Sequence, residues 1–143
     1  RAPPPACVPR PPGVRSPRGD GRLALARVKE QLERDWEDRR PPLLEAVDDV
    51  SPDELLQTLE KWLVDRPGNA AVLVTAGRVA LKARLWGKAQ NFFEAAANSS
   101  QSATALAELS RLYLALGDQV KAAKVLERRV AELDGQLPDL PLP

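Results

Sequence analysis

Apolar residues recur at helical spacing along most of this chain, and polar, Pro-containing or Gly-containing breaks separate the runs. In residues 70–84 the apolar or small side chains stand three and four positions apart, at Leu73, Ala76, Gly77, Ala80 and Leu81. This spacing places them on one face of an α-helix. The same criterion predicts helices over residues 21–39, 43–50, 52–65, 70–84, 88–97, 102–116 and 119–133. We therefore expect an all-α fold of about seven helices.

Residues with known capping roles mark where several of these helices begin and end. Ser51 precedes Pro52 and stands three positions before Glu54, which is the pattern of a capping box with Pro at the first helical position. Pro41 with Pro42 ends the first helix at about residue 39, because the residue before a Pro is disfavoured in helical conformation. Gly87 and Gly117 mark short turns between helices, so we expect neighbouring helices to pair as antiparallel hairpins.

Two stretches of sequence repeat at a distance of 33 residues. Ala89 and Ala122 take the same place in the two stretches, and so do Phe93 and Leu126. A period of this length is typical of arrays of helical hairpins. Gly77 stands within a predicted helix, where Gly costs about 1 kcal/mol relative to Ala, so we expect it to allow close helix contact. In the last hairpin we expect these apolar residues to face the core: Leu106, Leu109, Leu112, Tyr113, Leu116, Val120, Ala123, Leu126 and Val130.

The two ends of the chain lack helical periodicity. Residues 1–20 hold seven of the 14 prolines and several arginines, and this composition predicts a disordered segment. An SH3-type ligand is the alternative there, and we expect Cys7 to be an exposed thiol. The predicted organisation is a disordered segment 1–20, a helical repeat domain 21–134 and a disordered tail 135–143. Since the sequence contains no Met, we expect it to be part of a longer protein.

The repeated pairs resemble the tetratricopeptide repeat, in which two antiparallel helices span about 34 residues. Consensus positions of that repeat are matched in the later pair by Leu106, Leu109, Ser110, Tyr113, Gly117, Ala122 and Leu126, and in the earlier pair by Leu73, Gly77, Ala89, Phe93 and Ala96. Arg129 and Asp134 depart from the pattern, and Gln101 stands where Pro is usual. The resemblance covers residues 52–134, and it implies a right-handed stack of helix pairs that binds other proteins.

A narrower resemblance concerns the C-terminal repeat region of HemY, a family of bacterial inner-membrane proteins linked to late haem biosynthesis. It is carried by Leu59–Leu63 and Pro67, by Ala80–Leu81, by Leu85–Ala89 and by Asp35–Glu37. This resemblance implies a preceding region with two membrane spans, so membrane attachment would come only from that missing N-terminal part. The repeats would then lie on the cytoplasmic side of the inner membrane. A generic scaffold in another assembly pathway, or a haem or porphyrin carrier, is the alternative.

The residue types favour binding over catalysis. The chain has no His, and its carboxylates fall mostly on predicted solvated helix faces, so we expect no catalytic residues and no enzyme activity. The acidic cluster Asp48, Asp49, Asp53 and Glu54 could hold Ca²⁺ weakly, but helix N-terminal acids that complement the dipole are the simpler explanation. We expect no metal site and no cofactor, because the usual haem ligands His and Met are absent and Tyr113 stands at a core position.

Charge and repeat position together predict a binding groove. Residues 21–69 contain 8 basic and 12 acidic residues, whereas residues 70–130 contain 9 basic and 4 acidic ones. In tetratricopeptide arrays the first helix of each pair lines a concave groove, and the groove-facing positions here are Val74, Arg78, Lys82, Ala107, Arg111 and Leu114. Arg78 and Arg111 are 33 residues apart, so stacking brings them together, where two guanidinium groups can hold a carboxylate. The alternative is that both arginines are solvated, or that they pair with Glu94 or Glu108.

The predicted partner is therefore a protein or peptide that carries acidic groups. Nucleic acid is not expected, because the basic residues have no accompanying aromatic platform for bases. Trp62 and Trp86 are expected to pack in the core or between neighbouring repeats rather than to form a binding site. Since three repeat units are near the minimum for a stable array, self-association that covers the open end of the stack is possible.

Overall fold

A computed structural model describes residues 20–136 and 138–141, and this part of the chain is helical without strands. Residues 1–19 of the predicted segment 1–20, with Cys7, and residues 137, 142 and 143 lie outside the described residues, and Asp20 begins the first helix. The described residues form six α-helices and two short 3₁₀ helices: α1 (Asp20–Arg34), η2 (Pro41–Ala46), α2 (Pro52–Asp65), α3 (Ala70–Lys82), α4 (Trp86–Ala96), α5 (Ser102–Ala115), α6 (Gln119–Leu133) and η3 (Asp134–Gln136). The all-α prediction is confirmed.

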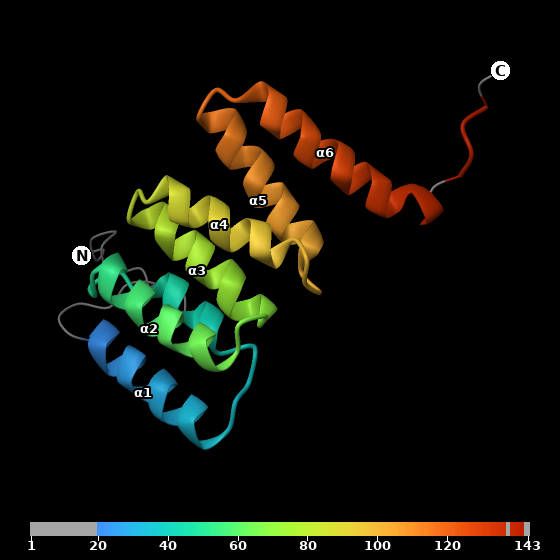
Figure 1. The fold of residues 1–143 in the computed structure, drawn as a ribbon. Helices are drawn as coiled ribbons and strands as arrows, with labels where there is room; N and C mark the ends of the chain where they lie inside the picture. The colour runs from blue at the N-terminus through green and yellow to red at the C-terminus, as the bar shows by residue number, and fades with distance from the viewer. Residues whose placement is uncertain (1–19, 137, 142–143) are drawn as a thin grey trace, which may run out of the picture.

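Helices α2 to α6 form a series in which each packs on the next, with α1 at one end and α6 at the other (Figure 1). The connections between them are three to five residues long, and connections this short join antiparallel neighbours. η2 packs against α3 and α1. The buried side chains form one continuous core along the whole series, from Leu25 in α1 to Ala122 in α6.

The closest helix contact is between α3 and α4. A Cβ atom added at Gly77 would lie 2.6 Å from the ring of Phe93, whose side chain is completely buried. The absence of a side chain at Gly77 therefore lets the Phe93 ring lie directly against the α3 backbone. The prediction that Gly77 allows close contact with a neighbouring helix is confirmed.

The start of α2 follows the capping signal in the sequence, and Glu54 makes a further contact to α1. The Ser51 hydroxyl accepts a hydrogen bond from the Glu54 N–H at 3.2 Å, as the sequence predicts. The Glu54 carboxylate accepts two hydrogen bonds from Arg22, at 2.8 and 2.9 Å, so it joins α2 to α1. This contact holds the pKa of Glu54 below its usual value, chiefly through the hydrogen bond from Arg22.

The turns after α3 and α5 have the same backbone shape. Arg84 and Gly117, 33 positions apart, both have positive φ, at 60° and 80°. In each turn the next N–H bonds to a carbonyl five residues back, from Leu85 to Ala80 and from Asp118 to Tyr113. This is the bond pattern of a helix end closed by a left-handed residue. Gly tolerates that conformation, whereas Arg at the equivalent position is strained.

The segment between α1 and α2 differs from the prediction. α1 ends at Arg34 rather than at about residue 39, because Trp36 turns to pack edge-on against Trp62, with the ring centroids 5.8 Å apart. Asp38 accepts hydrogen bonds from Trp36 and Asn69, at 2.7 and 2.8 Å. These contacts replace the last turn of helix predicted there. Trp62 is partly buried against the core, as expected.

The short helix predicted at residues 43–50 is a 3₁₀ helix, η2. Its two buried residues, Pro41 and Leu44, are three apart, because a 3₁₀ helix brings residues i and i+3 to the same side. Val47 and Val50, which follow η2, are also buried, and Leu43 is exposed.

The prediction for the last hairpin is wrong for its outer face. Ala105, Leu106, Leu109, Leu112, Tyr113 and Ala122 are buried, but Leu116, Val120, Ala123, Leu126 and Val130 are exposed. The reason is positional, because α6 packs principally on α5 and no further helix among the described residues lies on its other side (Figure 1). Residues that are core in the middle of a series become surface at its end.

Candidate functional site

The predicted groove-facing side of α3 is occupied by the chain itself. Arg78 donates to the Glu45 carboxylate at 3.3 Å, and Lys82 contacts the Glu45 carbonyl and the Asp48 carboxylate, at 3.8 Å for the latter. Val74, one turn before Arg78, is buried. Since residues four apart share a helix face, η2 and the residues after it cover the side of α3 that carries these three predicted site residues. This part of the predicted groove is partly covered, although Lys82 is still exposed.

The equivalent side of α5 is open. Ala107, Arg111 and Leu114 are all exposed, with Leu114 at 56% and the Arg111 side chain at 77%. The three residues lie on one face of α5 because they are separated by four and three positions. Of the six predicted site residues, these three are exposed together on one helix face, whereas Lys82 is exposed beside its contacts to Glu45 and Asp48.

Arg78 and Arg111 are brought together, as the 33-residue spacing predicts, but a carboxylate already lies between them. Arg111 Nη1 lies 2.9 Å from Glu108 Oε1, and Arg78 Nη2 lies 4.0 Å from the same atom. The Glu108 side chain is mostly buried. This is the pairing with Glu108 that the sequence left open as the alternative to a groove that holds an acidic ligand.

A cavity of about 510 Å³ lies beside this cluster, where the end of α3 and the start of α4 meet α5. Its walls are mainly apolar, and they comprise Leu81, Trp86, Glu108, Arg111, Leu112, Leu114 and Ala115. Trp86 is 42% exposed. The prediction that Trp86 packs between repeats is therefore wrong in part, because one side of its indole faces the cavity.

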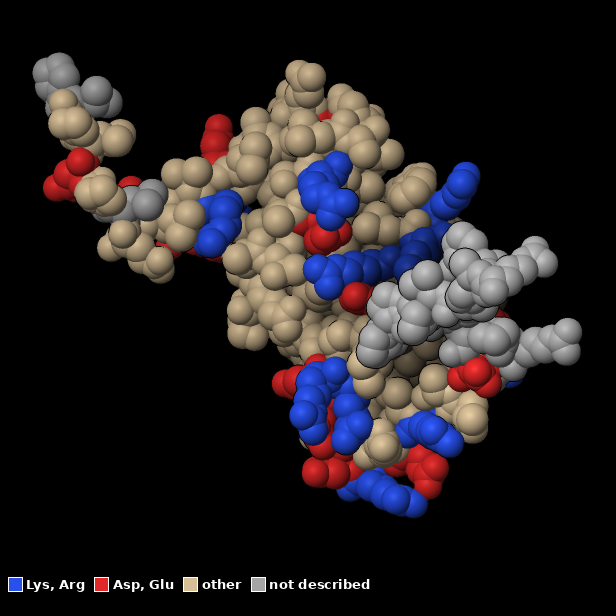
Figure 2. Space-filling view, turned by 180° about the vertical axis from the view of Figure 1, so that it is seen from behind, with Lys and Arg blue, Asp and Glu red and all other residues tan. Residues whose placement is uncertain are grey.

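Sequence reasoning found Arg111 and Leu114 and missed the apolar walls. The sequence predicts Leu81 and Leu112 on apolar helix faces without a role in a site, predicts packing for Trp86, and gives no signal for Ala115. The available signal was Trp86 itself, because a large aromatic residue in a short inter-helix turn has little room for complete burial. On the face shown in Figure 2, basic and acidic side chains are interleaved rather than gathered by sign.

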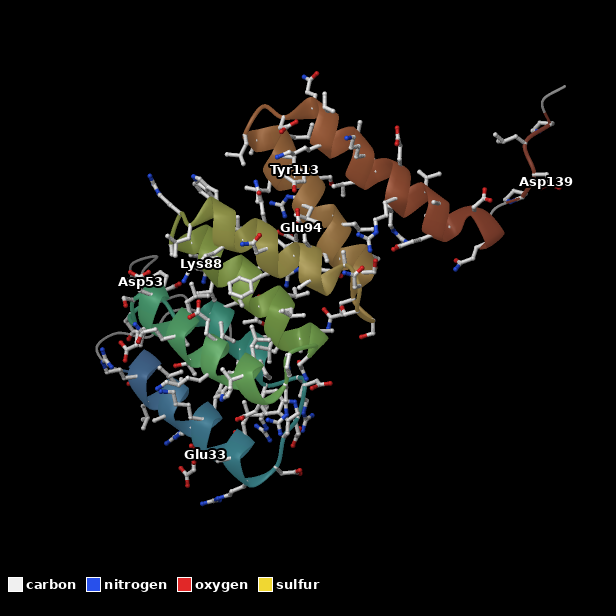
Figure 3. All side chains as sticks on the ribbon, in the orientation of Figure 1. Glu33, Asp53, Lys88, Glu94, Tyr113 and Asp139 are labelled. Carbon is white, nitrogen blue, oxygen red and sulfur yellow. The ribbon has the colours of Figure 1, made fainter. Side chains whose placement is uncertain are left out.

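A second polar cluster connects α4, α5 and α6. The Tyr113 hydroxyl donates to the Glu94 carboxylate at 3.0 Å, and the two side chains lie together in Figure 3. Burial, then the Glu94 contact, raises the pKa of Tyr113 to about 12. Lys121 lies 5.7 Å from the Tyr113 ring, and Arg128 donates to the Asn98 side chain at 2.9 Å. Because Tyr113 stays protonated and donates to Glu94, the cluster connects helices rather than supplying a nucleophile.

The described residues contain no group of three potential ligands placed to hold a metal ion. Within residues 20–136 and 138–141, no helix combines the length and the apolar character needed to cross a lipid bilayer. No protein-family model, curated protein or solved structure matches the chain.

Proposed function

We propose that this chain is a non-catalytic protein-interaction module of the tetratricopeptide type, with its helix pairs stacked in a right-handed array. Support comes from the 33-residue period, from the equivalent turns at Arg84 and Gly117, and from the packing of each helix on the next. The single observation that carries a binding role is the apolar cavity beside Arg111, because an exposed Trp and Leu next to an Arg are typical of an interaction site.

The ligand that fits this site is a peptide segment with one large apolar side chain and a carboxylate nearby. The apolar side chain would enter the cavity between Trp86 and Leu114, which would remove both residues from water. The carboxylate would bind Arg111, whose guanidinium is mostly exposed and has further N–H donors beyond the contact to Glu108. Glu108 at the inner wall disfavours a second carboxylate deep in the cavity, so the acidic group belongs at the rim.

A peptide-display selection against the full chain tests this proposal. We expect enriched peptides to share an acidic residue within a few positions of a Leu, Phe or Trp. Binding of a synthetic enriched peptide, measured by fluorescence anisotropy, should weaken about tenfold or more with Leu114→Glu and with Arg111→Gln, which removes the charge without adding a carboxylate beside Glu108. Both positions are exposed, so the helical circular dichroism signal should be unchanged. Leu23→Glu, on the exposed side of α1, is the matched control and should leave affinity unchanged.

Arg78 is a poor position for this test. Replacing it with Glu would place a third carboxylate beside Glu45 and Glu108, which Arg78 now bridges, so lost binding could reflect local rearrangement. Enriched peptides whose affinity does not change with Arg111→Gln or Leu114→Glu would exclude the cavity as the binding site.

The setting that we propose is the repeat region of a HemY-type inner-membrane protein, on the cytoplasmic side, associated with haem biosynthesis. The resemblance of residues 59–89 to that family supports it. A gene whose upstream sequence encodes no membrane spans would instead favour a generic scaffold. Direct haem carriage is disfavoured, because Tyr113, the only tyrosine, is buried and donates to Glu94. We expect a haemin titration to leave the Soret band unshifted.

A further inference from the structure

The outer face of α6 is a second apolar surface, separate from the cavity beside Arg111. A shallow groove of about 610 Å³ runs along it, lined by Ala123, Leu126, Glu127, Val130, Ala131 and Asp134. Leu126 is 50% exposed, and Val120 and Val130 are more exposed still. Contiguous exposed apolar side chains on one face are typical of an interaction surface.

Comparison of α6 with α4, one 33-residue period earlier, indicates that the outer face of α6 lacks a covering helix. Shifting α6 back by one period places Leu126 on Phe93, Glu127 on Glu94 and Val130 on Ala97. In that earlier position Phe93 is completely buried, with its ring against Gly77 of α3, and α5 packs on the same helix, α4. Tyr113, on α5, donates a hydrogen bond to Glu94. A helix that covered α6 as α5 covers α4 would therefore bring a donor to Glu127 and cover the exposed apolar side chains beside it.

The charges of α6 specify the chemistry of that helix. The basic side chains of α6 turn toward the rest of the molecule: Lys121 lies over the Tyr113 ring and Arg128 bonds to the Ala97 carbonyl. The ion pairs of α6, Lys121 with Asp118 and Arg129 with Glu132, do not include Glu127 or Asp134. Two acidic residues therefore line an apolar groove without basic neighbours in it, and a basic partner is complementary to them.

We propose that the outer face of α6 binds an amphipathic helix of a partner protein, placed on α6 as α5 is placed on α4. The apolar stripe of that helix covers Ala123, Leu126 and Val130, and a Lys or Arg beside the stripe pairs with Glu127. A second copy of this chain, docked through its own α6, is a poorer occupant. Antiparallel pairing of two α6 faces would bring the acidic residues of both copies together with no basic side chain between them.

A peptide derived from α5 is a suitable probe, because α5 covers the equivalent face of α4. Two stapled peptides have the sequence of residues 102–116, one with Tyr113→Lys and the other with Tyr113→Glu. Position 113 of the peptide is expected to meet Glu127, because Tyr113 of α5 meets the equivalent residue Glu94. Their binding to the full chain is measured by fluorescence anisotropy. We expect the Lys peptide to bind about tenfold more tightly than the Glu peptide. Glu127→Lys in the chain should reverse that order.

Leu126→Glu in the chain should weaken both peptides about tenfold or more, whereas Leu114→Glu in the separate cavity should not. This pair of variants distinguishes the α6 surface from the site beside Arg111. Failure of both peptides to bind would refute the proposal. So would binding that persists with Leu126→Glu, which is the result expected if the peptide displaced α5 from α4. Light scattering that shows a dimer dissociated by Leu126→Glu would assign the face to a second copy instead.

Discussion

Gly77→Ala tests the contact that holds α3 against α4. The new methyl group would lie 2.6, 2.7 and 2.9 Å from three ring atoms of Phe93, where ordinary contacts are 3.4–4 Å. Phe93 has no exposed surface, so its ring has no solvent-filled space to move into. The strain must be relieved by separating the two helices or by forcing the ring away from its preferred side-chain conformation.

The expected magnitude is the difference between two opposing effects. Overpacking in a core costs about 1–3 kcal/mol, and the three close contacts here place Gly77→Ala at the upper end. The change also gains about 1 kcal/mol of helix propensity, because Ala replaces Gly inside a helix. We therefore expect a net loss of about 2 kcal/mol in the free energy of unfolding. For a domain of this size, that corresponds to a fall in Tm of about 10 °C.

Urea unfolding followed by circular dichroism measures this change, and Gly87→Ala is the matched control. Gly87 lies in α4 with nothing within 4 Å of an added Cβ, so the same substitution should be neutral or stabilising there. The double variant Gly77→Ala with Phe93→Leu should be less destabilised than the sum of the two single variants, because the smaller side chain makes room for the methyl group. The reasoning is refuted if Gly77→Ala is as stable as the wild type.

Three further predictions concern the equivalent turns, the end of the series and Tyr113. Arg84→Gly should raise the free energy of unfolding by about 0.5–1 kcal/mol in thermal unfolding, because it relieves the positive φ. In urea unfolding, Phe93→Ala should lower the free energy of unfolding by about 3–5 kcal/mol. Leu126→Ala, at the equivalent repeat position, should lower it by less than about 1 kcal/mol. The pKa of Tyr113 is raised to about 12 in the folded state. The contribution of Tyr113 to the free energy of unfolding should therefore be complete below about pH 10 and should be lost as the pH rises toward 12. In Tyr113→Phe this loss of stability at alkaline pH should be smaller.

The helices could be predicted because their signals are local. Periodic apolar positions, the Ser51–Pro52 start and the Gly117 turn act within a few residues, and each appears in the structure where the sequence places it. The early end of α1 could not be predicted in this way. It depends on Trp36 meeting Trp62 and on Asp38 meeting Asn69, which are contacts between residues 26 and 31 positions apart.

Part of the candidate site could be predicted from the repeat spacing, and part depends on contacts between residues far apart in the sequence. The repeat spacing placed Arg78 and Arg111 close together, and both approach Glu108. The spacing could not show that Glu45 of η2 would contact Arg78 and Lys82, because η2 belongs to no repeat unit. The predicted groove is thus partly covered at α3 and open at α5.

Repeat equivalence explains why the apolar surface on α6 lies where it does. A periodic sequence specifies the same residue types at each repeat, but a helix in the middle of the series has neighbours on two sides and the last helix has one. Phe93 and Leu126 come from the same repeat position, yet one is completely buried and the other is half exposed. An apolar residue at the end of the series therefore keeps the pattern of a core residue while it lies on the surface. Interaction surfaces in this chain are accordingly expected where repeat positions lose their covering helix, rather than where the sequence departs from the repeat.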